Sequence, residues 1–186
     1  MNHGPIGFPE EGLSDGRIRL RLLREDDFGR LVELANEPQV ARFTTMPPPH
    51  TDAEARSWFN ASAAGLRAGT DLHPLIVDAD SGDLLGGCGI ARRAGDERIW
   101  GIGYWVAAAY RGNGHAARAV RLISPFAFTT LAIDRLELLA EEVNPASIRT
   151  AENCGFTREG ILRAYLEIAG ERRDMVSYSL LPGEAG

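Results

Sequence analysis

The feature that most constrains the fold of this 186-residue chain is a strand-like run, a glycine-rich turn and a helix-like run that follow one another directly. Residues 99–106 are apolar and strand-like, and residues 116–129 are helix-like. Between them, residues 111–116 read Arg-Gly-Asn-Gly-His-Ala. Glycine permits positive φ and close backbone approach, and a helix N-terminus adds about half a positive charge. The turn therefore predicts a phosphate or pyrophosphate site, although a bare Gly-x-Gly turn also occurs where nothing binds.

Two common nucleotide-binding motifs do not fit this turn. A Walker A loop requires lysine, and the chain contains none. A dinucleotide-binding fold places its glycines after the first strand, whereas here they come past residue 110. The turn by itself indicates a bound phosphate and leaves the ligand open.

The composition indicates one globular domain, over residues 15–182, preceded by a flexible tail at residues 1–14. A net charge of −6 disfavours nucleic-acid binding. The two cysteines and four scattered histidines predict neither a disulfide framework nor a metal site. No apolar run is long enough to span a membrane, and the first residues do not resemble a signal peptide, so we expect a cytoplasmic protein.

Hydrophobic periodicity predicts an α/β fold with a mixed sheet and helices on both faces. Helices are expected from residue 25 up to Pro38, and over 51–69, 114–129 and 145–154, with an extended Pro47–Pro49 segment. The expected strands are 17–22, 72–77, 84–92, 98–106, 135–143, 156–167 and 172–180. Three successive strands before the glycine turn exclude a simple doubly wound fold.

A second group of residues follows the strand after the glycine turn. Asn144 is a good helix N-cap, Pro145 suits the first helical position, and Ser147 lies in the first turn. This local role does not exclude a functional one, because the Asn144 amide has both a donor and an acceptor.

Together these motifs resemble the GNAT superfamily of acyl-CoA-dependent N-acyltransferases, from about residue 17 to residue 181. Arg111, Gly114 and Ala116 match the pattern (Arg/Gln)-x-x-Gly-x-(Gly/Ala). Asn144-x-x-Ser147 and the stretch Cys154-Gly155-Phe156-x-x-Glu159-Gly160 match downstream. The stretches that resemble the RimJ/RimL-like branch, which is associated with N-terminal acetylation of ribosomal proteins, are Leu20-x-x-Leu23-Arg24-x-x-Asp27, Trp58 and Ile102-Gly103-Tyr104-Trp105-Val106.

The resemblance implies a GNAT fold of about seven strands in which two central strands splay apart to admit acetyl-CoA as co-substrate, without a metal. Trp105 and Val106 would pair with the pantetheine arm, and a backbone N–H there would polarise the thioester carbonyl. Asn144 would hydrogen-bond the pantetheine. The pyrophosphate would be held by Arg111, Gly112, Asn113, Gly114, His115 and Ala116.

The resemblance also implies direct attack of an amine on the thioester, with two proton transfers. Ser147 is the candidate donor to the leaving sulfur, and Tyr165 is its alternative. Many relatives carry a glutamate where this chain has Gly101, so the base is open: Glu142 is the first candidate, Glu167 and Asp174 are others, and a water chain could serve. His115 is expected to act through its backbone. Cys88 and Cys154 are expected to pack rather than react.

The acceptor remains open. A protein N-terminus is the first candidate, a small amine such as an antibiotic, a polyamine or an amino acid is the second, and a catalytically weak acyl-CoA-binding regulator is the third. The acceptor is expected to bind between the first two helices, including residues 43–49, and the hairpin loop at 166–174. A homodimer is compatible with the family.

Overall fold

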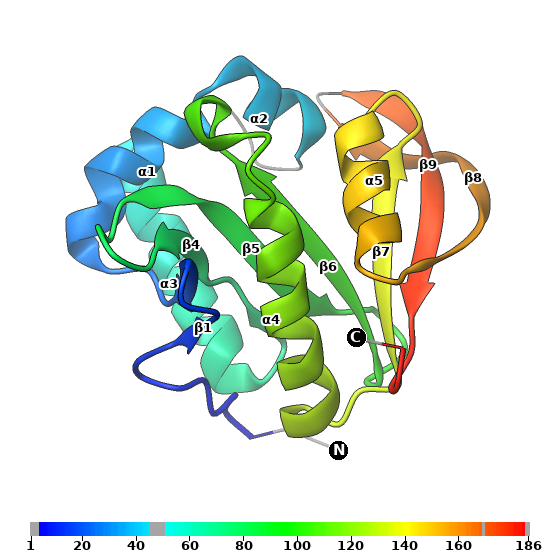
Figure 1. Cartoon of the computed structure of the whole chain (residues 1–186), viewed down its shortest axis with the longest axis horizontal. Helices are drawn as coiled ribbons and strands as arrows, with labels where there is room; N and C mark the ends of the chain where they lie inside the picture. Colours follow the sequence, from blue (N-terminus) through cyan, green and yellow to red (C-terminus); the bar gives the residue numbers. More distant parts are fainter. Residues whose placement is uncertain (1–3, 45–50, 169, 185–186) are drawn as a thin grey trace.

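The computed structural model describes residues 4–44, 51–168 and 170–184, and they form one mixed sheet flanked by helices (Figure 1). The sheet order is β1-β2-β4-β5-β6-β7-β9-β8, and β3 pairs with β5. The strands are β1 (Leu13–Ser14), β2 (Ile18–Arg21), β3 (Asp71–Leu72), β4 (Leu75–Asp78), β5 (Leu84–Arg92), β6 (Ile99–Val106), β7 (Arg135–Glu141), β8 (Thr157–Ile168) and β9 (Glu171–Leu180). The helices are α1 (Phe28–Ala35), α2 (Pro38–Phe43), α3 (Asp52–Ala68), α4 (His115–Thr130) and α5 (Pro145–Asn153), with short 3-10 turns at Glu25–Asp27 and Ala108–Tyr110.

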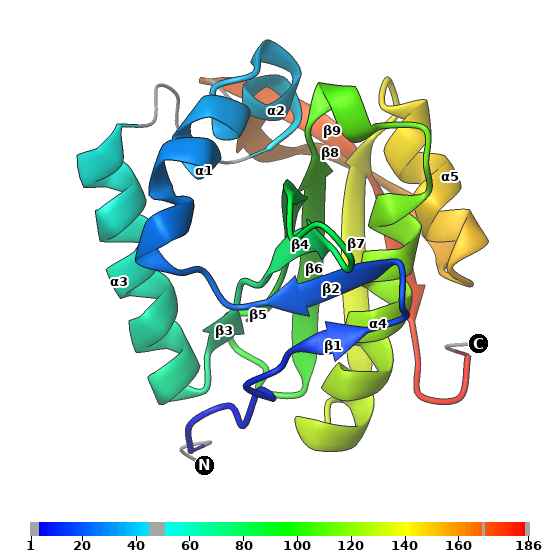
Figure 2. The same cartoon turned by 60° about the vertical axis from the view of Figure 1, so that its left-hand side comes forward.

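Helices cover both faces of the sheet, as expected (Figure 2). Strand alternation sends Leu75 and Val77 into a core with α1 and α3, and sends Ile76 into a larger core with α4. We call these two sides the α3 face and the α4 face. The sheet has nine strands rather than about seven because β1 and β3 are additional two-residue strands.

The central strands β6 and β7 separate along their length, as the family resemblance predicts (Figure 1). They are the parallel pair of the sheet, and their register runs from Ile99–Arg135 to Ile102–Leu138 and stops there. Beyond this point β6 stays paired to β5 as far as Val106, and β7 stays paired to β9 as far as Glu141. Each strand therefore keeps one unpaired edge, and these two edges face the gap between them.

Helix α3 begins and ends where its sequence predicts. The Glu54 amide donates to Thr51 Oγ1 at 3.3 Å, and the Thr51 amide donates to Glu54 Oε2 at 2.6 Å, which completes a capping box. Gly69 ends the helix with a φ of 71°, in the left-handed region that glycine adopts without strain.

Three element boundaries differ from the expectation. Pro38 does not end a helix but begins α2, because the first helical position needs no N–H donor. The strand expected over 72–77 is interrupted at His73-Pro74, and β7 ends at Glu141 rather than at residue 143. The predicted extended segment Pro47–Pro49 lies outside the described residues.

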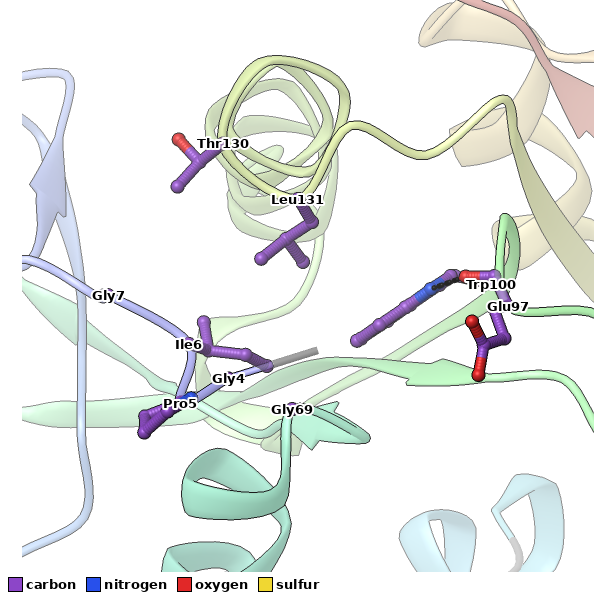
Figure 3. Close-up of a pocket in the computed structure, with 9 residues that line it drawn as sticks. All are labelled: Gly4, Pro5, Ile6, Gly7, Gly69, Glu97, Trp100, Thr130 and Leu131. Atoms are coloured by element: carbon purple, nitrogen blue, oxygen red, sulfur yellow. Dashed lines mark hydrogen bonds between the residues drawn. The ribbon is translucent and has the colours of Figure 1, made fainter. Parts of the chain in front are cut away.

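Part of the segment expected to be a flexible tail contacts the rest of the fold, from Ile6 onward. The Ile6 amide donates to the Leu66 carbonyl at 2.9 Å, and the Phe8 ring meets Phe126 edge-on with 5.5 Å between centroids. Ile6, Trp100 and Leu131 point into one small cavity of about 190 Å³ (Figure 3). The apolar side chains of this glycine- and proline-rich stretch therefore pack against α3 and α4.

Candidate active site

A cavity of about 870 Å³ lies where β6 and β7 separate. Its lining includes Gly114 and Ser147, at the N-terminal ends of α4 and α5, and Trp105 and Glu141, on the two separated strands. The gap thus connects the α4 face of the sheet with the α3 face. A ligand in the gap can contact helix N-termini on one face and strand side chains on the other.

The glycine turn borders the α4-face side of this cavity. Gly112 and Gly114 have φ values of +82° and +75°, and no described atom lies within 4 Å of the place where either Cβ would stand. The Arg118 amide closes the first turn of α4 on the Gly114 carbonyl at 3.0 Å. The amides that precede it have no carbonyl to meet within the helix, so they are available to an anion.

The other residues of the turn have different roles. Arg111, His115 and Ala116 line the cavity, whereas Asn113 does not. The Asn113 side-chain amide instead donates to the Tyr110 carbonyl at 3.2 Å, which holds the turn closed.

Arg111 is held at the mouth of the cavity by contacts with its neighbours. Its Nε donates to the Val106 carbonyl at 2.8 Å, and its guanidinium also contacts Gln39 and lies 3.8 Å from the Glu37 carboxylate. The positive charge expected at the turn is therefore present, and residues at the start of α2 hold the Arg111 guanidinium against the end of β6.

Asn144 and Ser147 lie together on the α4 face, beside the gap. Asn144 Oδ1 accepts a hydrogen bond from the Ser147 amide at 3.2 Å, so the local capping role is real. The Ser147 hydroxyl lies 3.0 Å from the Tyr104 hydroxyl, whose burial raises the pKa of Tyr104 to about 12. Tyr104 belongs to a stretch that carries the family resemblance, but the sequence assigned its hydroxyl no role in the site.

Glycines form the floor of the cavity on the α3 face. Gly87 and Gly89 of β5 leave room for two rings from other parts of the chain. A Cβ at Gly87 would stand 2.6 Å from the indole Nε1 of Trp105, and a Cβ at Gly89 would overlap Nδ1 of His73. The absence of side chains on β5 therefore lets both rings lie on the sheet.

On β6 the same face carries Gly101 and Gly103. A Cβ at Gly101 would lie 3.5 Å from the Arg93 guanidinium, whereas no described atom lies within 4 Å of the Cβ position of Gly103. Gly103 is also the first residue of β6 beyond the last pairing with β7. The floor is open at the point where the gap begins.

Two carboxylates of β7 line the cavity from the α3 face. Glu137 accepts hydrogen bonds from Arg93 Nε and Arg135 Nε, both at 3.0 Å. Glu141 is only 6% exposed, lies 3.9 Å from Arg42, and its Oε1 has no hydrogen-bond partner among the described residues. Glu141 is thus a buried carboxylate with a free acceptor atom.

The other candidate bases lie elsewhere. Glu142 is exposed in the turn after β7 and does not line the cavity. Neither Glu167 nor Asp174 lines it; both are exposed in the β8–β9 hairpin, where Asp174 accepts a hydrogen bond from the Ala164 amide at 2.7 Å. Tyr165, the alternative proton donor, is 44% exposed and also lies outside the lining. The alternation of side chains along β7 could have indicated Glu141, because Glu141 points to the same face of the sheet as Glu137.

Asp71 and His73 form a second polar pair that sequence analysis did not single out. Asp71 Oδ1 lies 3.3 Å from His73 Nε2, and Thr70 Oγ1 donates to Asp71 Oδ2 at 2.7 Å. Burial lowers the pKa of His73, and the Asp71 carboxylate offsets part of that drop. Asp71 lies in β3 and His73 directly follows it, and this two-residue spacing on an extended segment, which puts both side chains on one face, could have predicted the pair.

The two cysteines are buried and unlinked. Burial raises the pKa of Cys88 to about 12 and also raises the pKa of Cys154. Both thiols therefore stay protonated near neutral pH, which fits their expected packing role. Within residues 4–44, 51–168 and 170–184, no group of three potential metal-ligating side chains occurs, and no helix is long and apolar enough to cross a membrane.

Comparisons with known proteins agree with this architecture. Residues 17–157 match a family model described as the acetyltransferase (GNAT) domain. The "Putative ribosomal N-acetyltransferase YdaF" of Bacillus subtilis is 31% identical over 177 residues, which cover 90% of this chain and 92% of YdaF. The "Uncharacterized N-acetyltransferase p20" of Bacillus licheniformis is 27% identical over 94% of this chain and 98% of its own length.

A solved structure has the same fold. Mycobacterium smegmatis RimJ, in complex with CoA-disulfide, superposes with a TM-score of 0.82 at 26% identity, over 90% of this chain and 83% of RimJ. The splayed strands, the glycine turn and the family match all lead to one conclusion. The chain belongs to the GNAT family of N-acetyltransferases.

Proposed function

We propose that this N-acetyltransferase belongs to the RimJ/RimL-like branch and transfers the acetyl group of acetyl-CoA to the α-amine of a protein N-terminus. The observation that carries the proposal is the gap beyond Ile102 and Leu138, which opens to helix N-termini on one face and to a buried carboxylate on the other. The similarity to YdaF and to RimJ supports the choice of branch.

The α4 face fits the co-substrate, which supplies an activated acetyl thioester. The open space over Gly112 and Gly114 leaves backbone amides accessible to a pyrophosphate. The unpaired edge of β6 at Trp105 and Val106 offers backbone groups to an arm that carries amides, and the Asn144 side chain adds a further donor.

The proton donor proposed for the leaving sulfur is Ser147. Ser147 lines the cavity, and its hydroxyl is hydrogen-bonded to the Tyr104 hydroxyl. Because Tyr104 keeps its proton at any ordinary pH, it can donate to Ser147 Oγ while the Ser147 proton points toward the sulfur. The pair therefore offers a directed hydrogen bond where negative charge develops.

The α3 face fits an amine carried on an extended chain. The open space over Gly103 lets a backbone approach the sheet closely, and the free Oε1 of Glu141 can accept a hydrogen bond from an ammonium group. Glu142, the first carboxylate that the sequence offered as a base, lies in the exposed turn after β7 and does not line the cavity. Comparing variants of these adjacent glutamates separates the two assignments.

The experiment is an acetylation assay with purified protein, acetyl-CoA and amidated hexapeptides that begin with Ala or Ser. Released thiol gives the rate, and mass spectrometry gives the site of the added acetyl group. The same peptides with a blocked N-terminus and an internal lysine, and the polyamine spermidine, are the comparison acceptors. We expect acetylation of the free α-amine and not of the lysine side chain.

Three results would contradict the proposal. Exclusive acetylation of spermidine would assign the cavity to small amines. Tight binding of coenzyme A with no turnover on any acceptor would favour the regulatory module. Failure to bind coenzyme A would remove the assigned role of the glycine turn.

A further inference from the structure

His73 projects onto the α3 face beside the one unfilled part of the glycine floor. We propose that His73, held by Asp71, is the general base that removes a proton from the acceptor amine. This inference rests on the proposed N-acetyltransferase function and names the residue that the reaction still lacks.

The register of the sheet places His73 next to the gap. Its ring lies over Gly89, and Gly89 is paired with Gly103 across β5 and β6. Paired residues in an antiparallel ladder have Cα atoms about 4.5–5.5 Å apart. The space over Gly103 is empty in the described structure and opens at the separation of β6 and β7. An amine that reaches the gap from this face therefore passes alongside the imidazole.

The contacts of the ring prepare one nitrogen to accept a proton. Nε2 is the nitrogen that faces Asp71, at 3.3 Å, so a proton on Nε2 is stabilised by the carboxylate. Nδ1 then carries the lone pair; it lies over Gly89 and accepts no hydrogen bond from the described residues. The Thr70 hydroxyl donates a hydrogen bond to Oδ2, the other oxygen of the Asp71 carboxylate, and so orients it. This is the arrangement of a base with an orienting group.

The charged groups around His73 leave the imidazole neutral at pH 7. Burial lowers its pKa below the usual 6.5, and Asp71 opposes that shift only in part. On the same face, the positive charge of Arg93 is paired with Glu137 of β7. Glu141 lies further along β7, and Trp58 of α3 contributes a ring with its centroid 6.0 Å from that of His73. An imidazole in this setting can accept a proton when an ammonium group arrives.

The two carboxylates of the cavity are less suited to this step. Glu137 is engaged by two guanidinium groups, which stabilise its charged form against protonation. Gly103 is the first residue of β6 beyond the last pair, Ile102–Leu138, whereas Glu141 is the third residue of β7 beyond that pair, about 10 Å along its strand. Glu141 is placed to anchor the ammonium end of the acceptor, whereas His73 is placed beside the reacting nitrogen.

The proposed reaction forms one carbon–nitrogen bond, breaks one carbon–sulfur bond and releases one proton overall. His73 Nδ1 takes one proton from the ammonium, and the freed nitrogen lone pair forms a bond to the acetyl carbon. The carbon–sulfur bond breaks, and the sulfur takes a proton from Ser147, which regains one from water. The second proton of the amine leaves to solvent, and His73 releases its own proton before the next turnover.

The test compares His73→Gln and Asp71→Asn with the wild-type protein, using acetyl-CoA with the Ala and Ser hexapeptides and with glycinamide. We expect His73→Gln to lower kcat about 100-fold at pH 7, which is typical of losing a general base. The loss should shrink at pH 9, because an α-amine with a pKa of about 8 is then mostly unprotonated. Affinity for coenzyme A, measured by calorimetry, should be unchanged.

Asp71→Asn tests the positioning role. Removing its charge lowers the pKa of His73 further, so the acid limb of the kcat–pH profile should move to lower pH. A His73→Ala variant should regain peptide acetylation when free imidazole is added. A variant that merely fails to fold would not be rescued by imidazole. A kcat at pH 7 within twofold of wild type for His73→Gln, or a loss that is equal at pH 7 and pH 9, would overturn the proposal.

The acceptors distinguish failure of the base from failure of the proposed function. Turnover of glycinamide but of neither peptide contradicts acetylation of protein N-termini and still allows the His73 comparison. If the wild-type protein acetylates no amine, the pair is tested by NMR titration of the His73 imidazole. A His73 pKa that does not move in Asp71→Asn then overturns the pairing itself.

Discussion

The Tyr104 hydroxyl of β6 lies 3.0 Å from the Ser147 hydroxyl in the first turn of α5. Tyr104 also approaches the Ser147 carbonyl, at 3.2 Å. The two residues are 43 positions apart, and their contact bridges the strand on one side of the gap and the helix that follows the strand on the other. This contact makes the proton-donor assignment testable one hydroxyl at a time.

Ser147→Ala should lower kcat about tenfold, the equivalent of one lost hydrogen bond to the transition state. Affinity for coenzyme A should hardly change, because Asn144 caps α5 through the Ser147 backbone amide and not through its hydroxyl. Steady-state kinetics and calorimetry measure the two quantities. Tyr104→Phe should have a smaller effect, since Ser147 keeps its own proton. Unchanged turnover in Ser147→Ala would remove Ser147 from the donor role.

Gly114→Glu should abolish coenzyme A binding, because its carboxylate would enter the space that suits a pyrophosphate. Gly114→Asn is the matched control: asparagine tolerates the φ of +75°, and no described atom obstructs its Cβ. Calorimetry should show weakened but measurable binding for the control and none for Gly114→Glu. Wild-type affinity in Gly114→Glu would exclude the turn as the pyrophosphate site.

Glu141→Gln should raise the KM for the acceptor peptide about tenfold, because an amide cannot provide the charge-assisted hydrogen bond of a carboxylate. Glu142→Gln, one residue along in the exposed turn, is the control and should leave this KM unchanged. Peptide-dependent kinetics at saturating acetyl-CoA measure both. The opposite ranking of the two variants would restore Glu142 as the functional carboxylate.

Asp27→Asn should lower the free energy of unfolding by about 2 kcal/mol at pH 7. Asp27 accepts two hydrogen bonds from Arg21 and one from the Arg24 amide, all at 2.7 Å. Burial alone would raise the pKa of Asp27, but these bonds outweigh it and hold the pKa below its usual 3.8. This contribution to stability is complete above the pKa that Asp27 has in the unfolded chain. It is lost as the pH falls through the lower pKa that Asp27 has in the folded protein.

Urea unfolding of Asp27→Asn and the wild-type protein should therefore converge as the pH falls below about 4. Glu33→Gln is the control, because its ion pair with Arg30 is exposed and should contribute at most about 0.5 kcal/mol. A stability difference for Asp27→Asn that stays constant from pH 7 to pH 3 would argue against an ionic contribution.

The two cysteines should resist thiol reagents in the native protein at pH 8. Both thiols are buried, and their raised pKa values leave little thiolate. A colorimetric disulfide reagent should titrate neither cysteine before denaturant is added and both afterwards. Rapid labelling of Cys154 in the native state would show that the packing around α4 and α5 opens.

The sequence alone predicted the local features of the site, because each depends on neighbours in the chain. The glycines of the turn, the capping box of Thr51 and Glu54, and the Asn144 cap are all determined by short-range backbone chemistry. The family resemblance added the splayed strand pair, which the register of β6 and β7 bears out.

The tertiary structure decided which side chains meet. Glu141 lines the cavity at the end of β7, whereas its neighbour Glu142 is exposed in the turn that follows, and only the folded strand distinguishes the two. Tyr104 with Ser147, and His73 over Gly89, join segments that no sequence spacing relates. Such pairings follow from strand register and from the space that glycines leave, and both exist only once the sheet has formed.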